Sequence, residues 1–177
     1  MREKAVYDKI IRRKRLAPAV QSAVSFPCPV MAPCLIPVIH DSSPCCINVP
    51  FMAEGETYFV TSFSLQGPFG AVITDKLDAL DISLHGHLLS THPLFPLGAD
   101  IVFVEIACKD MIKARLYERE KGQVEYSQRG ACAAFAAAVI LEKSYGSAFV
   151  AMGSKTCRVE WDGVDGDLKL YKVISPY

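Results

Sequence analysis

The sequence predicts an α+β fold in which a curved, mainly antiparallel β-sheet wraps around a buried central helix. The first observation is the stretch 131–141, which is helical in character and apolar on nearly every face, so it must be buried. The second is the order of the elements, because strand patterns lie on both sides of this one helix. The third is the alternation of apolar and polar residues over 111–117, which is typical of a half-buried strand.

Composition sets the class of protein. The chain has 177 residues, 51% of them hydrophobic and 21% charged, as expected for a folded globular protein. The formal net charge is zero, so nothing in the overall charge indicates a nucleic-acid partner. There is no apolar run of about 18 residues and no secretory signal pattern, so we expect a cytoplasmic protein with no membrane partner.

Cysteine and histidine residues raise the question of a metal site. The seven cysteines have no regular spacing, which favours reduced thiols. One candidate set lacks paired Cys-x-x-Cys spacings and is interrupted by prolines; it comprises Cys28, Cys34, His40, Cys45 and Cys46. A second set surrounds a predicted helix end and comprises His85, His87 and His92. His85 and His87 are two residues apart and face different sides of a helix. We therefore expect no metal and no cofactor.

The first 50 residues predict little regular structure. Residues 1–16 predict a basic helix with four consecutive cations, Arg12 to Arg15. Such a run can bind nucleic acid, but a solvated terminal helix is favoured because the rest of the chain is not basic. Residues 17–50 are rich in proline, which restricts them to connectors and edge strands, with extended pieces around Val24 and over 35–39.

The middle of the chain predicts a strand, a break and a helix. Residues 56–65 are rich in β-branched and aromatic side chains, Gln66-Gly67-Pro68 interrupts them, and 71–74 resumes the strand. Residues 77–89 predict a helix, ended by the segment 92–98. Its expected apolar side consists of Leu77, Leu80, Leu84 and Leu88.

The remaining elements are predicted to be strands around the central helix. Residues 100–107 and 111–117 form a pair joined by a turn at Lys109-Asp110. Gly146 is the expected C-cap of the central helix. Three strands follow at 149–152, 156–161 and 167–173, the last two joined by a hairpin loop at 162–166.

The junction between the second strand of that pair and the central helix is the candidate site. Glu118 and Arg119 end the strand, and a short polar loop with Ser127, Gln128 and Arg129 leads into the helix. The first turn of a helix offers unpaired N–H groups and a partial positive charge, so it can hold an anion. Cys132, two residues beyond Gly130, is interpreted as a small core residue.

Several motifs stand in an order that resembles the C-terminal half of diaminopimelate epimerases, over about residues 24–172. They are Gly67-Pro68-Phe69, HPLFPLGADIVFVE at 92–105, RLYERE at 115–120, Gly122, GACA at 130–133 and KTCRVEWDG at 155–163. The resemblance implies two similar lobes, each a sheet curled around a helix. It divides this chain into a basic segment (1–20), a partial first lobe (21–66) and a second lobe (67–177).

The resemblance also implies chemistry. This family of isomerases interconverts LL- and meso-diaminopimelate in lysine biosynthesis without a cofactor, using one cysteine from each lobe across the α-carbon. A helix N-terminus lowers a thiol pKa and stabilises the carboxylate of the developing carbanion. Two acid–base groups are needed because inversion moves protons on opposite faces.

The chain departs from the family pattern at the groups that move protons. In the motif E-R-G-x-G-E-T-x-A-C-G-T-G, Glu118 and Arg119 match, whereas Ser127 stands at the cysteine. Gln128 and Arg129 stand at the next Gly and Thr. Gly67 replaces the asparagine of the motif G-N-P-H, and Phe69 its histidine. Asp100 replaces a substrate-contacting asparagine, and the first-lobe motif C-G-N-G is absent from the sequence.

Three functions are compatible with these residues. The first is a degenerate or fragmentary epimerase-like protein with little activity alone, because a serine hydroxyl ionises far less readily than a thiol. The second is a non-catalytic module that binds an amino acid or another carboxylate at the helix N-terminus. The third is a half-protein that completes its site with a second copy or with a complementing lobe. The expected ligand-contacting residues are Gly67, Asp100, Glu118, Arg119, Gln128 and Arg129.

Overall fold

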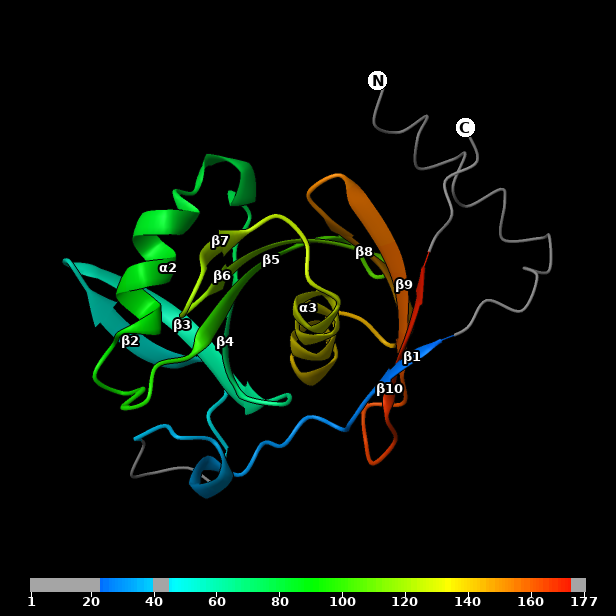
Figure 1. Ribbon diagram of the computed structural model, residues 1–177, viewed down its shortest axis with the longest axis horizontal. Coiled ribbons are helices and arrows are strands. Elements are labelled where there is room, and N and C mark those ends of the chain that lie inside the picture. The colour runs from blue at the N-terminus through cyan, green and yellow to red at the C-terminus, as the bar shows by residue number, and fades with distance from the viewer. Residues whose placement is uncertain (1–22, 40–44, 173–177) are drawn as a thin grey trace.

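The computed structural model describes residues 23–39 and 45–172, which form one ten-stranded mixed sheet and two α-helices (Figure 1). The sheet order is β1-β10-β9-β8-β6-β5-β4-β3-β2, and β7 pairs with β6 outside this path. The strands are β1 (Val24–Phe26), β2 (Val49–Ala53), β3 (Glu56–Ser64), β4 (Pro68–Ile73), β5 (Asp100–Cys108), β6 (Met111–Glu118), β7 (Gly122–Val124), β8 (Gly146–Met152), β9 (Lys155–Trp161) and β10 (Leu168–Lys172).

The prediction of an α+β fold is confirmed. Among the described strands, β4–β5 and β6–β8 pair in parallel and the other pairs are antiparallel. The basic segment 1–20, with its run of four cations, and His40 lie outside the described residues. The strands β2 and β7 were not predicted.

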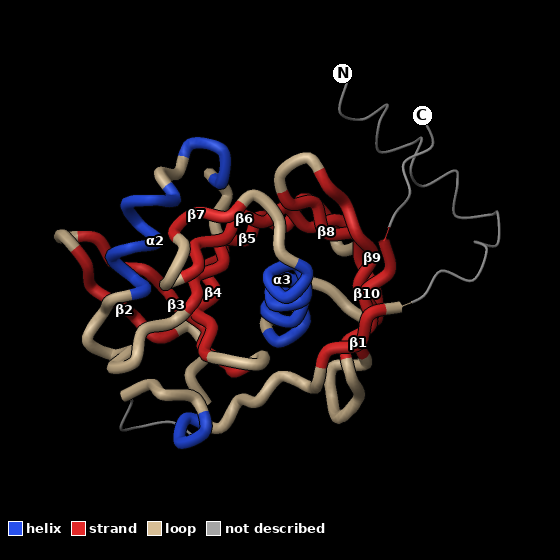
Figure 2. Tube along the Cα trace, viewed as in Figure 1, coloured by secondary structure: helices blue, strands red, loops and turns tan. Residues whose placement is uncertain are grey.

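The central helix α3 (Gln128–Ile140) lies inside the curve of the sheet (Figures 1 and 2). It contacts β4, β5 and β6 on one side and β8, β9 and β10 on the other. Residues 130–138 are all buried, and the only large side chain among them is that of Phe135. Small alanine side chains let the surrounding strands approach the helix backbone closely, which explains how one helix contacts six strands.

The second helix, α2 (Ile82–Ser90), covers the other face of the sheet and belongs to a separate hydrophobic cluster. Its Gly86 lies against β6, where an added Cβ would come within 2.4 Å of Tyr117 Cβ. The prediction of one helix over 77–89 was wrong. Leu77–Ala79 is a 3-10 turn (η3), Leu80 is extended, and Asp81 caps α2 by accepting a hydrogen bond from Leu84 N at 3.0 Å.

The predicted apolar side of that helix was also wrong, because the helix starts later. Its buried residues are Ile82, Gly86, Leu89 and Ser90, whereas Leu84 is 46% exposed. A predicted start that lies one turn too early includes residues that never enter the helix. The leucine spacing therefore gave the wrong buried face.

Two further predictions need correction. Gly146 does not cap α3, because Leu141 is the C-cap and Gly146 begins β8 with a φ of +59°. The residue in the left-handed region just after the helix is Glu142, with a φ of +57°. Residues 35–39 do not form a strand; Pro33–Leu35 is a 3-10 turn (η2), and Ile39 N donates to Leu94 O at 2.8 Å.

Strand register assembles the candidate site from distant parts of the sequence. Residues Gln66 and Gly67 make the turn between β3 and β4, with φ of +54° and +135°. The parallel pairing of β4 with β5 sets Phe69 opposite Asp100. Antiparallel pairing of β5 with β6 sets Ile101 opposite Tyr117, next to Glu118. These strand ends therefore converge on the first turn of α3.

In the part of the chain that the structure describes, neither helix is long and apolar enough to cross a membrane. Residues 23–39 and 45–172 also contain no group of three His, Cys, Asp or Glu side chains arranged to hold a metal.

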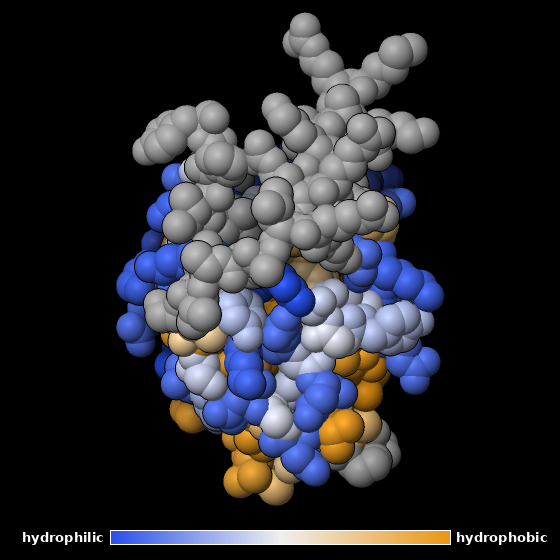
Figure 3. Space-filling model, turned by 90° about the vertical axis from the view of Figure 1, so that its right-hand side faces the viewer, coloured by the Kyte–Doolittle hydropathy of each residue, from blue (hydrophilic) through white to orange (hydrophobic). Residues whose placement is uncertain are grey.

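On the uncovered part of the face in Figure 3, hydrophilic side chains predominate and hydrophobic ones gather toward the lower rim.

Candidate functional site

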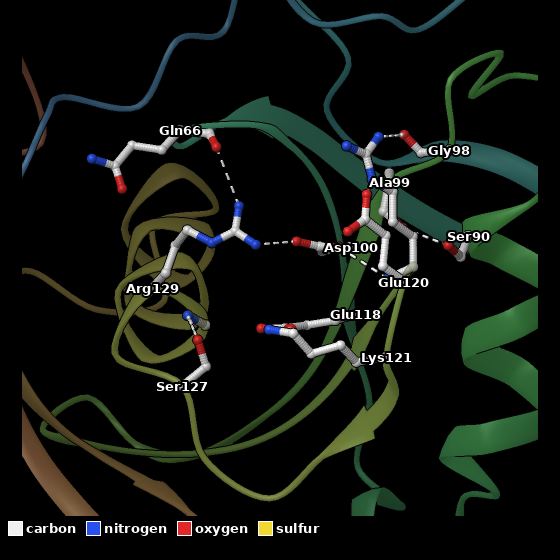
Figure 4. A network of polar contacts seen from close by, with 12 residues as sticks. Gln66, Ser90, Gly98, Ala99, Asp100, Glu118, Glu120, Lys121, Ser127 and Arg129 are labelled. Atoms are coloured by element: carbon white, nitrogen blue, oxygen red, sulfur yellow. Dashed lines mark hydrogen bonds and ion pairs between the residues drawn. The ribbon is translucent and has the colours of Figure 1, made fainter.

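The candidate site is the polar junction where the turn before β4, the start of β5, the end of β6 and the first turn of α3 meet (Figure 4). Beyond its first turn, α3 is surrounded by apolar side chains of the main core. The junction therefore concentrates charge at one end of an otherwise apolar helix.

Ser127, which the motif resemblance places at the position of the family cysteine, is the N-cap of α3. Its backbone is extended, with φ −145° and ψ 130°, and its Oγ accepts a hydrogen bond from Gly130 N at 3.2 Å. Its own N–H donates to Met152 Sδ at 3.4 Å. Serine is a favoured N-cap because its oxygen satisfies an N–H that has no partner within the helix. The hydroxyl thus has a structural role.

Gly130 explains why the cap lies close to the sheet. An added Cβ at this position would come within 2.7 Å of Leu116 Cδ2. A side chain here would press on β6 and move the start of α3 away from it. The glycine therefore fixes the distance between the helix start and the strand that carries Glu118.

The charged centre of the junction is an ion pair between Arg129 Nη2 and Asp100 Oδ2. The whole of Asp100 is only 5% exposed, and the Arg129 side chain is 27% exposed. The other carboxylate oxygen, Oδ1, accepts from Arg119 N at 3.0 Å. Both oxygens of this buried carboxylate are therefore hydrogen-bonded, as burial of a charge requires.

The rest of the Arg129 guanidinium is also engaged. Its Nη1 donates to Gln66 O at 3.3 Å, and its Cζ lies 4.9 Å from the centre of the Phe69 ring. A Cβ on Gly67 would lie 3.2 Å from Nη1, so a side chain at residue 67 would crowd the guanidinium. A carboxylate, a carbonyl and an aromatic face thus surround this one cation.

Glu118 and Arg119, the motif pair at the end of β6, point to different partners. Glu118 Oε2 accepts from Lys121 Nζ at 2.7 Å, although the Lys121 side chain is 72% exposed. Arg119 Nη1 donates to Leu97 O at 2.8 Å and lies 3.4 Å from Gly98 O. The side chains of the pair therefore make local contacts, while the Arg119 backbone holds Asp100.

Two other residues complete the junction. Gln128, one of the predicted ligand-contacting residues, is half-buried in the first turn, and no described residue hydrogen-bonds to its side chain. Glu125 is two residues before Ser127 in the sequence, but its Oε1 accepts a hydrogen bond from Ser154 Oγ at 3.1 Å. No described acid or histidine side chain hydrogen-bonds to Ser127 Oγ, whose partner is Gly130 N.

The two thiols nearest the site are core residues. Cys132, in α3, is fully buried, and burial raises the pKa of its thiol, with a smaller contribution from Cys157. Cys157, in β9, is 1% exposed, and burial raises its pKa from 9.0 to about 11. A thiol in this environment stays protonated at neutral pH, so neither has the character of a reactive cysteine. The interpretation of Cys132 as a small core residue agrees with its burial.

The structure brings together four of the predicted positions and adds two. Arg129 pairs with Asp100, Arg119 reaches Asp100 through its backbone, and a Cβ on Gly67 would lie 3.2 Å from Arg129 Nη1. Sequence reasoning missed the Gln66 carbonyl and the Phe69 ring as partners of Arg129. The signal that could have predicted the ion pair was a cation and an anion at two positions where the chain departs from the family pattern.

Comparison with known proteins gives one consistent result. A diaminopimelate epimerase from Leptospira biflexa is 28% identical over 133 residues, covering 75% of this chain and 48% of that protein. Diaminopimelate epimerase 1 from Nostoc sp. is 31% identical over 119 residues, covering 67% and 43%. The enzyme from Carboxydothermus hydrogenoformans is 32% identical over 113 residues, covering 64% and 40%.

No protein-family model matches the chain. The chain spans about half the length of the curated relatives it matches. The matched relatives nevertheless agree in name, and their matches cover most of the described residues. On this evidence the chain is related to the diaminopimelate epimerases over about two thirds to three quarters of its residues.

Proposed function

We propose that this chain is a degenerate diaminopimelate epimerase-like protein that keeps the framework of the second lobe and has little epimerase activity alone. The observation that carries the proposal is the role of Ser127. At the position where the family places a catalytic thiol, this chain has a hydroxyl that caps α3. A group held as a hydrogen-bond acceptor for the backbone is not poised to remove a proton.

The chemistry of the reaction supports the same conclusion. Removing an α-proton needs a base, and a serine hydroxyl acts as one only when a neighbouring group takes its proton. Glu125 is close enough to Ser127 in the sequence to be considered for taking this proton, but its carboxylate accepts a hydrogen bond from Ser154 instead. The buried thiols Cys132 and Cys157 have raised pKa values, so they do not supply a thiolate either.

The experiment is α-proton exchange. The chain is incubated with LL-diaminopimelate in D₂O, and loss of the α-proton signal is followed by ¹H NMR. We expect no exchange above the buffer rate for the wild type. Ser127→Cys restores one of two acid–base groups, so we expect it to form no meso-diaminopimelate, because inversion needs the second group on the opposite face. Exchange by the wild type would contradict the proposal. Ser83→Cys, which adds an exposed thiol on α2, controls for non-specific thiol chemistry.

A half-protein that borrows a complementing lobe is a second candidate. It is favoured by the share of the relatives that the chain matches, which is 40–48% of their length. Repeating the exchange assay with an added polypeptide carrying the first-lobe C-G-N-G motif tests this candidate. Exchange that needs both polypeptides would support it over the degenerate protein.

A non-catalytic carboxylate-binding module is a third candidate. It is favoured by the start of α3, where the N–H groups of Gln128 and Arg129 have no acceptor among the described residues. The ligand would be an amino acid or another small carboxylate. The contribution of Arg129 to binding such a ligand depends on its ion pair with Asp100.

A further inference from the structure

We propose that Asp100 is an internal counter-anion that occupies the guanidinium of Arg129 and so excludes an external carboxylate from the first turn of α3. This inference deepens the proposed function, since it rests on that turn being the family's ligand site. It assigns to Asp100 the control of which ligand charge the site accepts.

The first argument is that both terminal nitrogens of Arg129 already have partners. Its Nη2 pairs with the Asp100 carboxylate and its Nη1 donates to the Gln66 carbonyl at 3.3 Å (Figure 4). Its Cζ lies 4.9 Å from the centre of the Phe69 ring. A guanidinium binds a carboxylate best through two parallel N–H groups. An incoming carboxylate would therefore compete with an anion that is already paired with the same cation.

The second argument is that Asp100 is fixed in place before any ligand arrives. It begins β5 opposite Phe69, it is 5% exposed, and its Oδ1 accepts from Arg119 N at 3.0 Å. An anion held by the fold competes at a high effective concentration and loses no translational freedom on binding. A free carboxylate at millimolar concentration cannot match this advantage with the same contacts.

The third argument is that the neighbouring cations do not replace Arg129. Arg119 directs its guanidinium to the Leu97 and Gly98 carbonyls, and Lys121 contacts Glu118. Gly67 leaves room for Arg129 Nη1 where a Cβ would lie 3.2 Å from it, so the guanidinium occupies space that a side chain at residue 67 would crowd. Neutralising Asp100 is therefore the change that would release a binding site for a carboxylate.

The experiment measures ligand binding to the whole chain by isothermal titration calorimetry. The probes are glutarate, a dicarboxylate without an amine, and LL-diaminopimelate. Asp100→Asn keeps the shape of the side chain and an oxygen for Arg119 N, but it removes the charge. We expect both probes to bind this variant at least about tenfold more tightly than the wild type, as one regained charge-assisted contact allows.

Two variants make the result specific to the pair. Arg129→Thr combined with Asp100→Asn should lose the gain, because the released guanidinium is then absent. Asp75→Asn removes an exposed carboxylate outside the site and should leave the affinity unchanged. Unchanged affinity of Asp100→Asn, or a gain that persists without Arg129, would overturn the inference.

A measurement on the wild type keeps the inference testable if Asp100→Asn fails to fold. The ¹⁵N signal of the Arg129 side chain is followed by NMR while glutarate is added. We expect no shift, and a saturating shift would overturn the inference. Neither experiment reports catalysis, so the affinity gain of Asp100→Asn tests this inference separately from the α-proton exchange that tests the proposed function.

Discussion

The body of α3 and its first turn differ in almost every physical property, although they are consecutive along the chain. Residues 130–138 are entirely buried, mostly alanine, and packed by strands on both sides. Residues 127–129 are half-buried and polar, and they connect to the turn before β4, to β5 and to β8 through hydrogen bonds and one ion pair.

Under the proposed function, this difference teaches that the framework of a site can be kept while its chemistry is lost. The body of α3 depends on apolar volume, which many sequences can preserve. The first turn depends on particular groups, and here Ser127 accepts a hydrogen bond from Gly130 N while Arg129 pairs with Asp100. Each contact stabilises the fold, and each uses a group that a ligand or a reaction would need.

The largest effect is expected from truncating the core of the helix. Phe135→Ala should lower the free energy of unfolding by about 3–5 kcal/mol, because it removes a fully buried aromatic ring and leaves a cavity. Urea denaturation followed by circular dichroism measures this change. Leu84→Ala on α2 is the matched control, since Leu84 is 46% exposed and should cost well under half as much. Equal losses would mean that the two helices share one environment.

A smaller loss of stability is expected at alkaline pH, and it tests the buried core that surrounds the body of α3. The Cys157 thiol ionises near pH 9.0 in the unfolded chain but near 11 in the fold, because burial raises its pKa. The unfolded state therefore binds fewer protons above pH 9, and stability should fall as pH rises from about 9 to 11. The expected slope is about 1.4 kcal/mol per pH unit for each such thiol.

Denaturation midpoints between pH 8 and pH 11 test this slope. Cys157→Ala should make it shallower, whereas Cys108→Ala, which removes an exposed thiol, should leave it unchanged. The buried Cys132, whose pKa burial also raises, should maintain part of the slope in the Cys157 variant. A wild-type stability that is constant over this range would contradict the assignment of both thiols to a dry core.

Periodic patterns in the sequence predicted the central helix and several strands. Features that depend on caps or on contacts between distant residues were missed. The apolar stretch gave the buried helix, and the alternation at 111–117 gave β6. The boundary of α2 was missed because the leucine spacing continues through Leu77 and Leu80, while the cap at Asp81 sets the true start. Gly146 was misassigned because a left-handed glycine starts a strand as well as it ends a helix.

The site was predicted residue by residue but not as a network. Asp100 and Arg129 were recognised separately as replacements within a motif, yet they are 29 residues apart and no local rule pairs them. Pairing follows from the parallel register of β4 and β5 and from the position of α3 in the curve of the sheet. Opposite charges at two replaced positions are a signal that can be sought in other members of the family.

The smallest effect is expected at Ser127, and it tests whether the residue is only a cap. Ser127→Ala removes the acceptor of Gly130 N and should cost about 1 kcal/mol of unfolding free energy. Asp81→Ala removes the corresponding cap of α2, whose acceptor lies 3.0 Å from Leu84 N, and should cost a similar amount. Ser127→Asn keeps an acceptor and should cost a few tenths of a kcal/mol at most. A loss at Ser127 several times that at Asp81 would mean that the hydroxyl holds more of the junction than one backbone N–H. Equal losses would instead mean that a position occupied by a proton-transfer group in the family has become an ordinary helix cap here.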